Sequence, residues 1–137
     1  MPTLKAGCIL INTKTRQIGL VYRHNLNDLS FPKGHLEEGE TLAECAVRET
    51  EEETLRANHL AIDTPIHVIK YTTPKGEECE NYMYLSIDDG PTTKNIAIED
   101  REVLRWASID EVEDLLSYEN LKDVWRVAKP IIEKILL

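Results

Sequence analysis

The chain has 137 residues, of which 42% are hydrophobic, and carries a formal net charge of −9. This composition predicts one folded domain over residues 1–137 with no membrane span, since no apolar run approaches the roughly 20 residues that cross a bilayer. The negative charge disfavours sequence-independent binding of nucleic acid, which relies on Lys and Arg at phosphates.

Two apolar strands open the chain, over residues 6–12 and 17–23. The polar residues 13–16 between them predict a hairpin turn. Residues 24–33 are polar and predict a loop that leads to a helix.

A capping box predicts where that helix begins. Thr41 is followed three residues later by Glu44, so Thr41 is expected to be the N-cap. Residues 42–54 contain neither Gly nor Pro. Because Leu55 stands where a glycine would stop the helix, we expect the helix to continue at least to Arg56, with Asn58 as the stop.

The second half of the chain is expected to alternate strands with turns and to end in helices. Ser108 is expected to cap a helix that begins at Ile109, and Pro130 to interrupt a second helical stretch over residues 118–137. The expected strands are residues 61–73, 80–88 and 103–107.

Acidic residues are concentrated in one short segment. Residues 37–53 contain eight acids and one base, a net charge of −7, so the other 120 residues sum to only −2. Carboxylates at i, i+3 and i+4 of a helix repel each other. Glu49, Glu52 and Glu53 have this spacing, which by itself is typical of a solvated helix face. Together with the upstream Gly34 and Glu40 it favours a site for a hard divalent cation such as Mg²⁺.

The spacing of this segment resembles the signature box of the Nudix hydrolases. The chain departs from the usual pattern at Thr50, Leu55 and Arg56, none of which removes a carboxylate or the arginine. The matching positions are Gly34, Glu40, Arg48, Glu49, Glu52 and Glu53.

The resemblance implies an α+β fold, a Nudix-like α/β/α sandwich with a mixed sheet. It also implies hydrolysis of a nucleoside diphosphate linked to another group, with Mg²⁺, or Mn²⁺ in its place, as cofactor. The implied metal ligands are the Gly34 carbonyl, Glu49, Glu52 and Glu53. Arg48 would hold a catalytic carboxylate through a bidentate pair, and Glu40 would support the junction between loop and helix.

A further acid is expected from a later loop. Counting six residues back from Trp106 reaches Asp100, with Glu99 and Glu102 as alternatives. The general base is therefore Glu49, Glu52 or this loop acid.

The substrate is indicated by the segment Pro32-Lys33-Gly34-His35, which resembles a form common among dinucleoside polyphosphate hydrolases. Lys33 adds a positive charge for a phosphate chain, and Tyr71 and Tyr82 are candidates for stacking a base. Dinucleoside polyphosphates rank first, nucleoside triphosphate clean-up second, and ADP-ribose or inositol pyrophosphates lower. The opposing hypothesis is a nucleotide-binding module without catalysis.

The three cysteines lack the spacing of a zinc or redox site. Cys8 and Cys45 lie in apolar contexts and are interpreted as reduced core residues, which is typical of a cytoplasmic protein. No signal-peptide pattern is present at the N-terminus. The expected partner is a small nucleotide, without nucleic acid or membrane; the sequence does not predict the oligomeric state.

Overall fold

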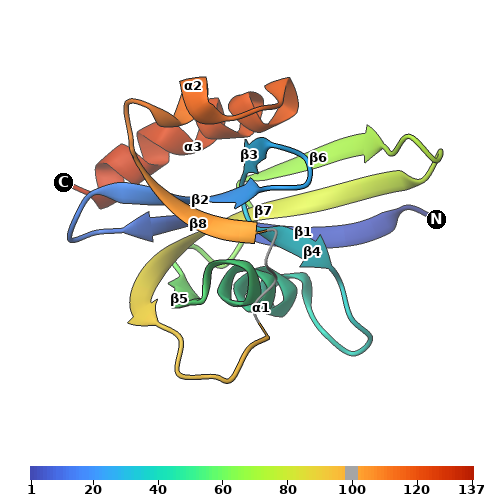
Figure 1. Ribbon diagram of the computed structural model, residues 1–137, viewed down its shortest axis with the longest axis horizontal. Helices are drawn as coiled ribbons and strands as arrows, with labels where there is room; N and C mark the ends of the chain where they lie inside the picture. Colours follow the sequence, from blue (N-terminus) through green and yellow to red (C-terminus); the bar gives the residue numbers. More distant parts are fainter. Residues whose placement is uncertain (98–101) are drawn as a thin grey trace.

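The computed structural model describes residues 1–97 and 102–137, which form an eight-stranded sheet between two helical layers (Figure 1). The helices are α1 (Leu42–Thr54), α2 (Val112–Leu115) and α3 (Glu119–Ile135). The strands are β1 (Thr3–Asn12), β2 (Gln17–Arg23), β3 (Asp28–Ser30), β4 (Lys33–His35), β5 (Arg56–Leu60), β6 (His67–Thr72), β7 (Glu78–Pro91) and β8 (Glu102–Ser108).

Strand β1 is the centre of the sheet. It pairs in parallel with β7 along most of its length, whereas the other strand pairs are antiparallel, so the predicted mixed sheet is confirmed. The opposite edge of β1 changes partner along its length. Its first half pairs with β4 through Lys5–Gly7, and its second half pairs with β2 through Leu10–Asn12.

Each face of the sheet has its own apolar core. Helix α3 covers one face with Trp125 and Val124, while α1 covers the other with Cys45 and Ala46, which pack against Cys8 of β1 (Figure 1). The cysteines are free thiols, as predicted, and burial raises the pKa of Cys8 to about 11. Among the described residues, no helix is long and apolar enough to cross a membrane.

The predicted start of α1 is confirmed. Thr41 accepts a hydrogen bond from the Glu44 amide, and the Glu44 carboxylate accepts one from the Thr41 amide in return. Thr50 is buried on the core face, and its hydroxyl accepts a hydrogen bond of 3.1 Å from the backbone N–H of Cys8. The hydroxyl thus joins the helix to β1.

The predicted end of α1 is wrong. The helix stops at Thr54, and Leu55 takes the left-handed conformation (φ 58°) that was expected to need glycine. The Leu55 amide caps the helix by donating to the Glu51 carbonyl, and the Leu55 carbonyl accepts from the Thr92 amide. Strand β5 then begins at Arg56, whose guanidinium forms a bidentate ion pair with Asp88 of β7. Tertiary contacts therefore impose a conformation that Leu disfavours.

Two strand boundaries also differ from the prediction. The expected strand over residues 61–73 is split, because the chain forms bends around Asp63-Thr64-Pro65 before β6 begins at His67. Strand β7 continues past the expected break to Pro91, because the early end of α1 brings Arg56 and Ala57 of β5 into register with its last residues. The loop expected over residues 24–33 also contains β3.

Both C-terminal helices differ from the prediction. Helix α2 starts at Val112 and not at Ile109. The Ser108 side chain does not cap it; instead, the Ser108 amide donates a hydrogen bond to the Glu111 side chain. Helix α3 continues through Pro130 without ending. An interior proline costs about 3 kcal/mol, and we attribute its tolerance to the apolar face, including Ala128 and Ile132, that α3 buries on both sides of it.

The left-handed cap gives a matched test. Leu55→Gly should be more stable than Leu55→Ala by about 1 kcal/mol, because only alanine retains the Cβ that this conformation disfavours. At Ala43, inside α1, the order should reverse, and Ala43→Gly should lose about 1 kcal/mol. Urea midpoints measure both comparisons; a more stable alanine variant at position 55 would contradict the cap.

Candidate active site

Gly34 allows the loop and the helix to approach closely. Glu49 of α1 lies directly over the Cα of Gly34 in β4, and a Cβ at this position would collide with the Glu49 carboxylate. A side chain at position 34 would therefore displace the Glu49 carboxylate. The contact brings a helix carboxylate to the backbone of β4, near the Gly34 carbonyl that was predicted as a metal ligand.

Arg48 connects the carboxylates of the box. Its guanidinium forms a bidentate pair with Glu40 (2.6 and 2.9 Å), and it also donates to Glu49 (2.7 Å), to Glu52 (3.2 Å) and to the His35 carbonyl (3.0 Å). The bidentate partner of Arg48 is therefore Glu40 and not a catalytic carboxylate, as had been expected. Glu49 is held by one hydrogen bond. The hydrogen bonds from Arg48 lower the pKa of Glu40 to about 2.

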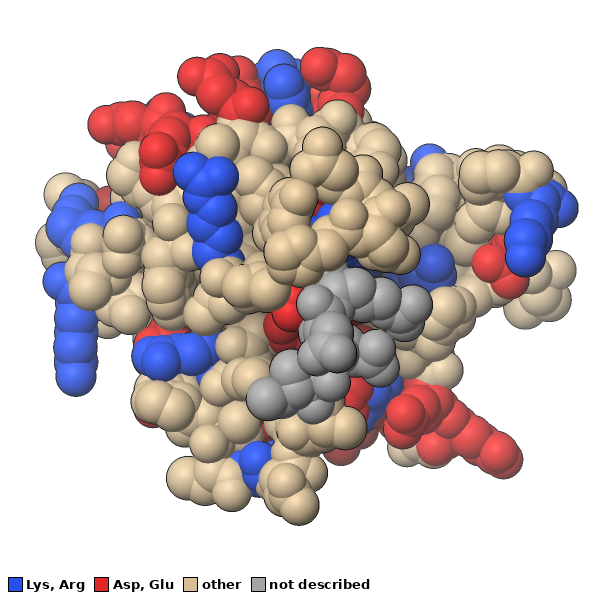
Figure 2. Space-filling model, viewed as in Figure 1, with Lys and Arg blue, Asp and Glu red and all other residues tan. Residues whose placement is uncertain are grey.

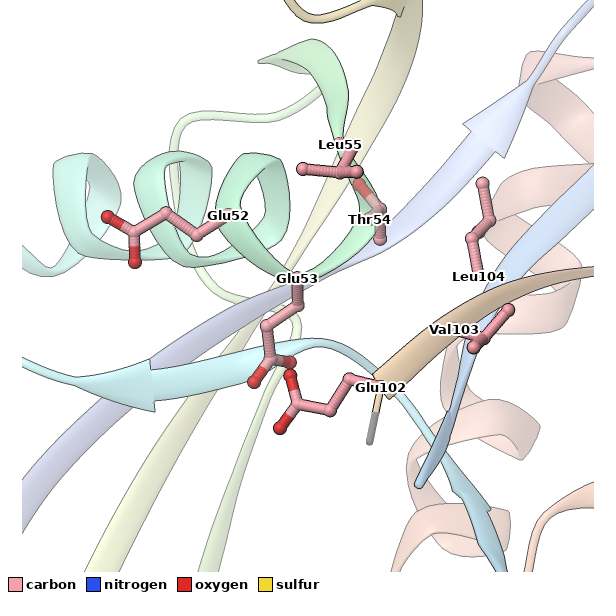
Figure 3. A pocket seen from close by; sticks show the side chains of 7 residues that line it. All are labelled: Glu52, Glu53, Thr54, Leu55, Glu102, Val103 and Leu104. Atoms are coloured by element: carbon pink, nitrogen blue, oxygen red, sulfur yellow. The ribbon is translucent and has the colours of Figure 1, made fainter. Parts of the chain in front are cut away.

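Glu53 is the most perturbed carboxylate of the site. Burial, together with the negative charge of Glu102, raises its pKa to about 8, although one of its oxygens accepts a hydrogen bond from the Lys33 amide (3.0 Å). Burial also raises the pKa of Glu49. Figure 3 shows the carboxylates of Glu53 and Glu102 turned toward each other, whereas Glu52 extends along the helix away from them.

Glu102 is the described candidate for the loop acid. It is the first residue of β8 and lines the same cavities as Glu49 and Glu53. Asp100, which the sequence favoured, and Glu99 lie outside the described residues.

Two cavities share Glu49, Glu53 and Glu102 in their lining. The first, the acidic cavity, also contains Glu52 and residues 95–97. The second, of about 410 Å³, also contains Lys5 and Lys33. Burial and the neighbouring charge of Lys5 lower the pKa of Lys33. Figure 2 shows acidic atoms in the middle of the viewed face and Lys or Arg atoms close by.

The sequence did not identify Lys5 as a site residue. Lys5 lies opposite His35 in the antiparallel pairing of β1 with β4, the strand that carries Lys33. This pairing joins residues 30 positions apart in the chain, and no local pattern predicts it.

The two candidate tyrosines lie on opposite faces of the sheet. Tyr71 packs against the core under α3, with the Lys5 ammonium 5.6 Å from its ring centroid. Tyr82 packs on the α1 side and donates to Glu80 (2.9 Å). The structure thus brings Tyr71, but not Tyr82, to the face that carries Lys5.

The donor set fits a hard divalent cation. The oxygens available are the carboxylates of Glu49, Glu52, Glu53 and Glu102 and the carbonyl of Gly34, the ligand type that Mg²⁺ and Mn²⁺ prefer. Burial, more than neighbouring negative charge, raises the pKa values of Glu49 and Glu53, and a bound cation would favour their ionised forms. Within residues 1–97 and 102–137, however, no group of three or more Asp, Glu, His or Cys side chains has the arrangement of a metal site.

The chain is similar to proteins of one known family. The family model of the NUDIX domain matches residues 1–134. A curated relative, the 8-oxo-(d)GTP phosphatase of Mycolicibacterium smegmatis, is 29% identical over 126 residues, which cover 90% of this chain. The chain spans only 37% of that relative's length.

Solved structures share the fold. A NUDIX hydrolase from Nitrosomonas europaea has a TM-score of 0.77 at 17% identity, covering 95% of this chain and 90% of its own. The Ap4A hydrolase of C. elegans has a TM-score of 0.74 at 18% identity, covering 96% of this chain and 99% of its own. The predicted sandwich is thereby confirmed.

The raised pKa of Glu53 predicts a pH dependence of stability. In the metal-free protein Glu53 keeps its proton up to about pH 8, whereas the unfolded chain releases it near 4.5. Over this interval the folded state binds more protons, so the free energy of unfolding falls as the pH rises. Glu53→Gln should weaken this fall in urea titrations, and the exposed control Glu38→Gln should not; equal slopes would contradict the shift.

Proposed function

The chain belongs to the Nudix family of hydrolases, and on this premise we propose that it cleaves a phosphoanhydride bond of a nucleoside diphosphate-linked compound with Mg²⁺ or Mn²⁺. One observation carries the proposal: a single cavity is lined by the acids Glu49, Glu53 and Glu102 and by the basic residues Lys5 and Lys33. Carboxylates and lysines in one cavity suit a phosphate chain delivered as its metal complex.

The chemistry follows from the charge of a diphosphate. Water must reach a phosphorus atom surrounded by negative oxygens, and a bound divalent cation neutralises that charge and acidifies the water. Lys5 and Lys33 would hold the phosphate oxygens, and Arg48 would keep Glu49 in position. A carboxylate then accepts the proton of the attacking water, which contributes about 10²–10⁴ in rate.

In this proposal the general base that accepts the proton of water is one of four carboxylates. Glu49 and Glu52 are the helix candidates, and Glu102 or Asp100 the later ones. The ionised form is the one that accepts a proton, so the raised pKa of Glu53 suits a group that becomes charged only when a metal binds.

We propose dinucleoside polyphosphates as the first substrate class. Two lysines offer contacts to a long phosphate chain, and Tyr71 beside Lys5 offers a surface for a base. A second class, nucleoside triphosphates with a damaged base, is favoured by the 8-oxo-(d)GTP phosphatase relative. ADP-ribose ranks below both, because it offers only two phosphates to the lysines.

Loss of one carboxylate tests the hydrolase assignment against a non-catalytic binding module. Glu52→Gln should reduce Mg²⁺-dependent cleavage of the nucleotide, measured as formation of its two products, by at least about 10²-fold, since a major electrostatic contribution is removed. The exposed loop variant Glu38→Gln is the control, and circular dichroism checks the fold. Full activity of a folded Glu52→Gln would remove Glu52 from the site, and a wild-type protein inactive with Mg²⁺ on all nucleotides would favour the binding module.

A lysine variant tests the substrate order. Lys33→Ala should lower kcat/KM more for a dinucleoside tetraphosphate than for ADP-ribose, because only the longer chain can contact both lysines. Lys75→Ala, in the turn between β6 and β7, is the charge-matched control. Equal losses on both substrates, or faster wild-type turnover of ADP-ribose, would contradict this substrate class and leave the hydrolase assignment intact. Mass spectrometry of the two products identifies the bond that is cleaved.

A further inference from the structure

Glu51 lies within the acidic run but points away from the acidic cavity. It is two residues from both Glu49 and Glu53, which places it about 200° around the helix from each. Only 7% of its surface is exposed. A carboxylate in this position requires partners, because burying an unpaired charge is costly.

The partners of Glu51 come from the segment that follows β7. The Thr92 hydroxyl donates to one carboxylate oxygen (2.7 Å), and the Lys94 ammonium donates to the other (2.8 Å). Burial by itself would raise the pKa of Glu51, but the bonds from Lys94 and Thr92 hold it below its usual value. The carboxylate is therefore ionised, and both of its oxygens are occupied.

Backbone contacts strengthen the link. The Thr92 amide donates to the Leu55 carbonyl at the end of α1 (2.9 Å), and the Lys94 amide donates to the Thr92 hydroxyl (3.1 Å). Residues 92–94 are thus fixed to the back of the same helix that presents the catalytic carboxylates. The next three residues, Asn95, Ile96 and Ala97, line the acidic cavity with Glu49, Glu52, Glu53 and Glu102.

We propose that Glu51 is a positioning residue: through Thr92 and Lys94 it holds residues 95–97 as a wall of the acidic cavity and so sets how tightly the nucleotide is bound. The effect on binding rests on the proposed function; the effect on the segment does not. Since Glu49, Glu52 and Glu53 lie on the helix itself, loss of the link displaces the wall and leaves these carboxylates in place. KM should therefore change more than kcat.

The alternative is that Glu51 only stabilises the helix end. Substitutions at its partners separate the two roles. Thr92→Val removes the hydroxyl at nearly constant volume, whereas Thr92→Ser keeps the hydroxyl and loses the methyl group. Lys94→Ala removes the ammonium from a side chain that is 69% exposed, so it should not prevent folding. Thr73→Val, in the turn between β6 and β7, is a matched hydroxyl loss away from the cavity.

The experiment combines steady-state kinetics on diadenosine tetraphosphate with Mg²⁺ and amide hydrogen exchange of residues 92–97. We expect Thr92→Val and Lys94→Ala to raise KM about tenfold, a modest case of substrate misplacement, with kcat changed less than KM. Both should also speed exchange in residues 92–97. Thr92→Ser and Thr73→Val should match the wild type in KM and in exchange of this segment.

Two results would overturn the proposal. One is unchanged exchange of residues 92–97 in Thr92→Val and Lys94→Ala, and the other is faster exchange with an unchanged KM. If the wild type hydrolyses no nucleotide, the proposed function fails, and the exchange data alone decide whether Glu51 positions this segment.

Discussion

One guanidinium, that of Arg48, holds together carboxylates that would otherwise repel each other. It lies 2.6 to 3.5 Å from Glu37, Glu40, Glu49 and Glu52, so four acids of the run, two before the helix and two within it, gather around one positive charge. Within the described residues Glu53 has no guanidinium partner, and its pKa is raised. The acidic run thus contains acids paired with Arg48 and one acid that is not, and in the proposed function this last acid is left for a cation.

The sheet supplies the opposite charge. Because one edge of β1 changes partner from β4 to β2, β4 lies beside Lys5, and Lys33 of β4 lines the same cavity as Lys5. Helix α1 covers the other face, so Tyr82 is directed away from Lys5 while Tyr71 remains near it. The proposed substrate site therefore depends on one strand pairing.

Two features of the box helix come from residues other than the six that match the family pattern. Leu55 replaces the expected glycine and still adopts the left-handed cap, because bonds from Thr92 and within α1 hold it there. Glu51 lies between ligand candidates, yet it connects the helix to Thr92 and Lys94. The family pattern thus predicts the acidic site, whereas Leu55 and Glu51 connect the helix that carries it to the segment after β7.

The sequence by itself determined what depends on neighbouring residues: the hairpin turn at residues 13–16, the Thr41 cap, and the carboxylates that 3.6-residue periodicity brings to one helix face. Tertiary structure decided the rest. The end of α1 at Thr54, the entry of Lys5 into the site and the separation of Tyr71 from Tyr82 all depend on strand pairs between distant residues. Local patterns predict which side chains share a face, but only the folded sheet decides which faces meet.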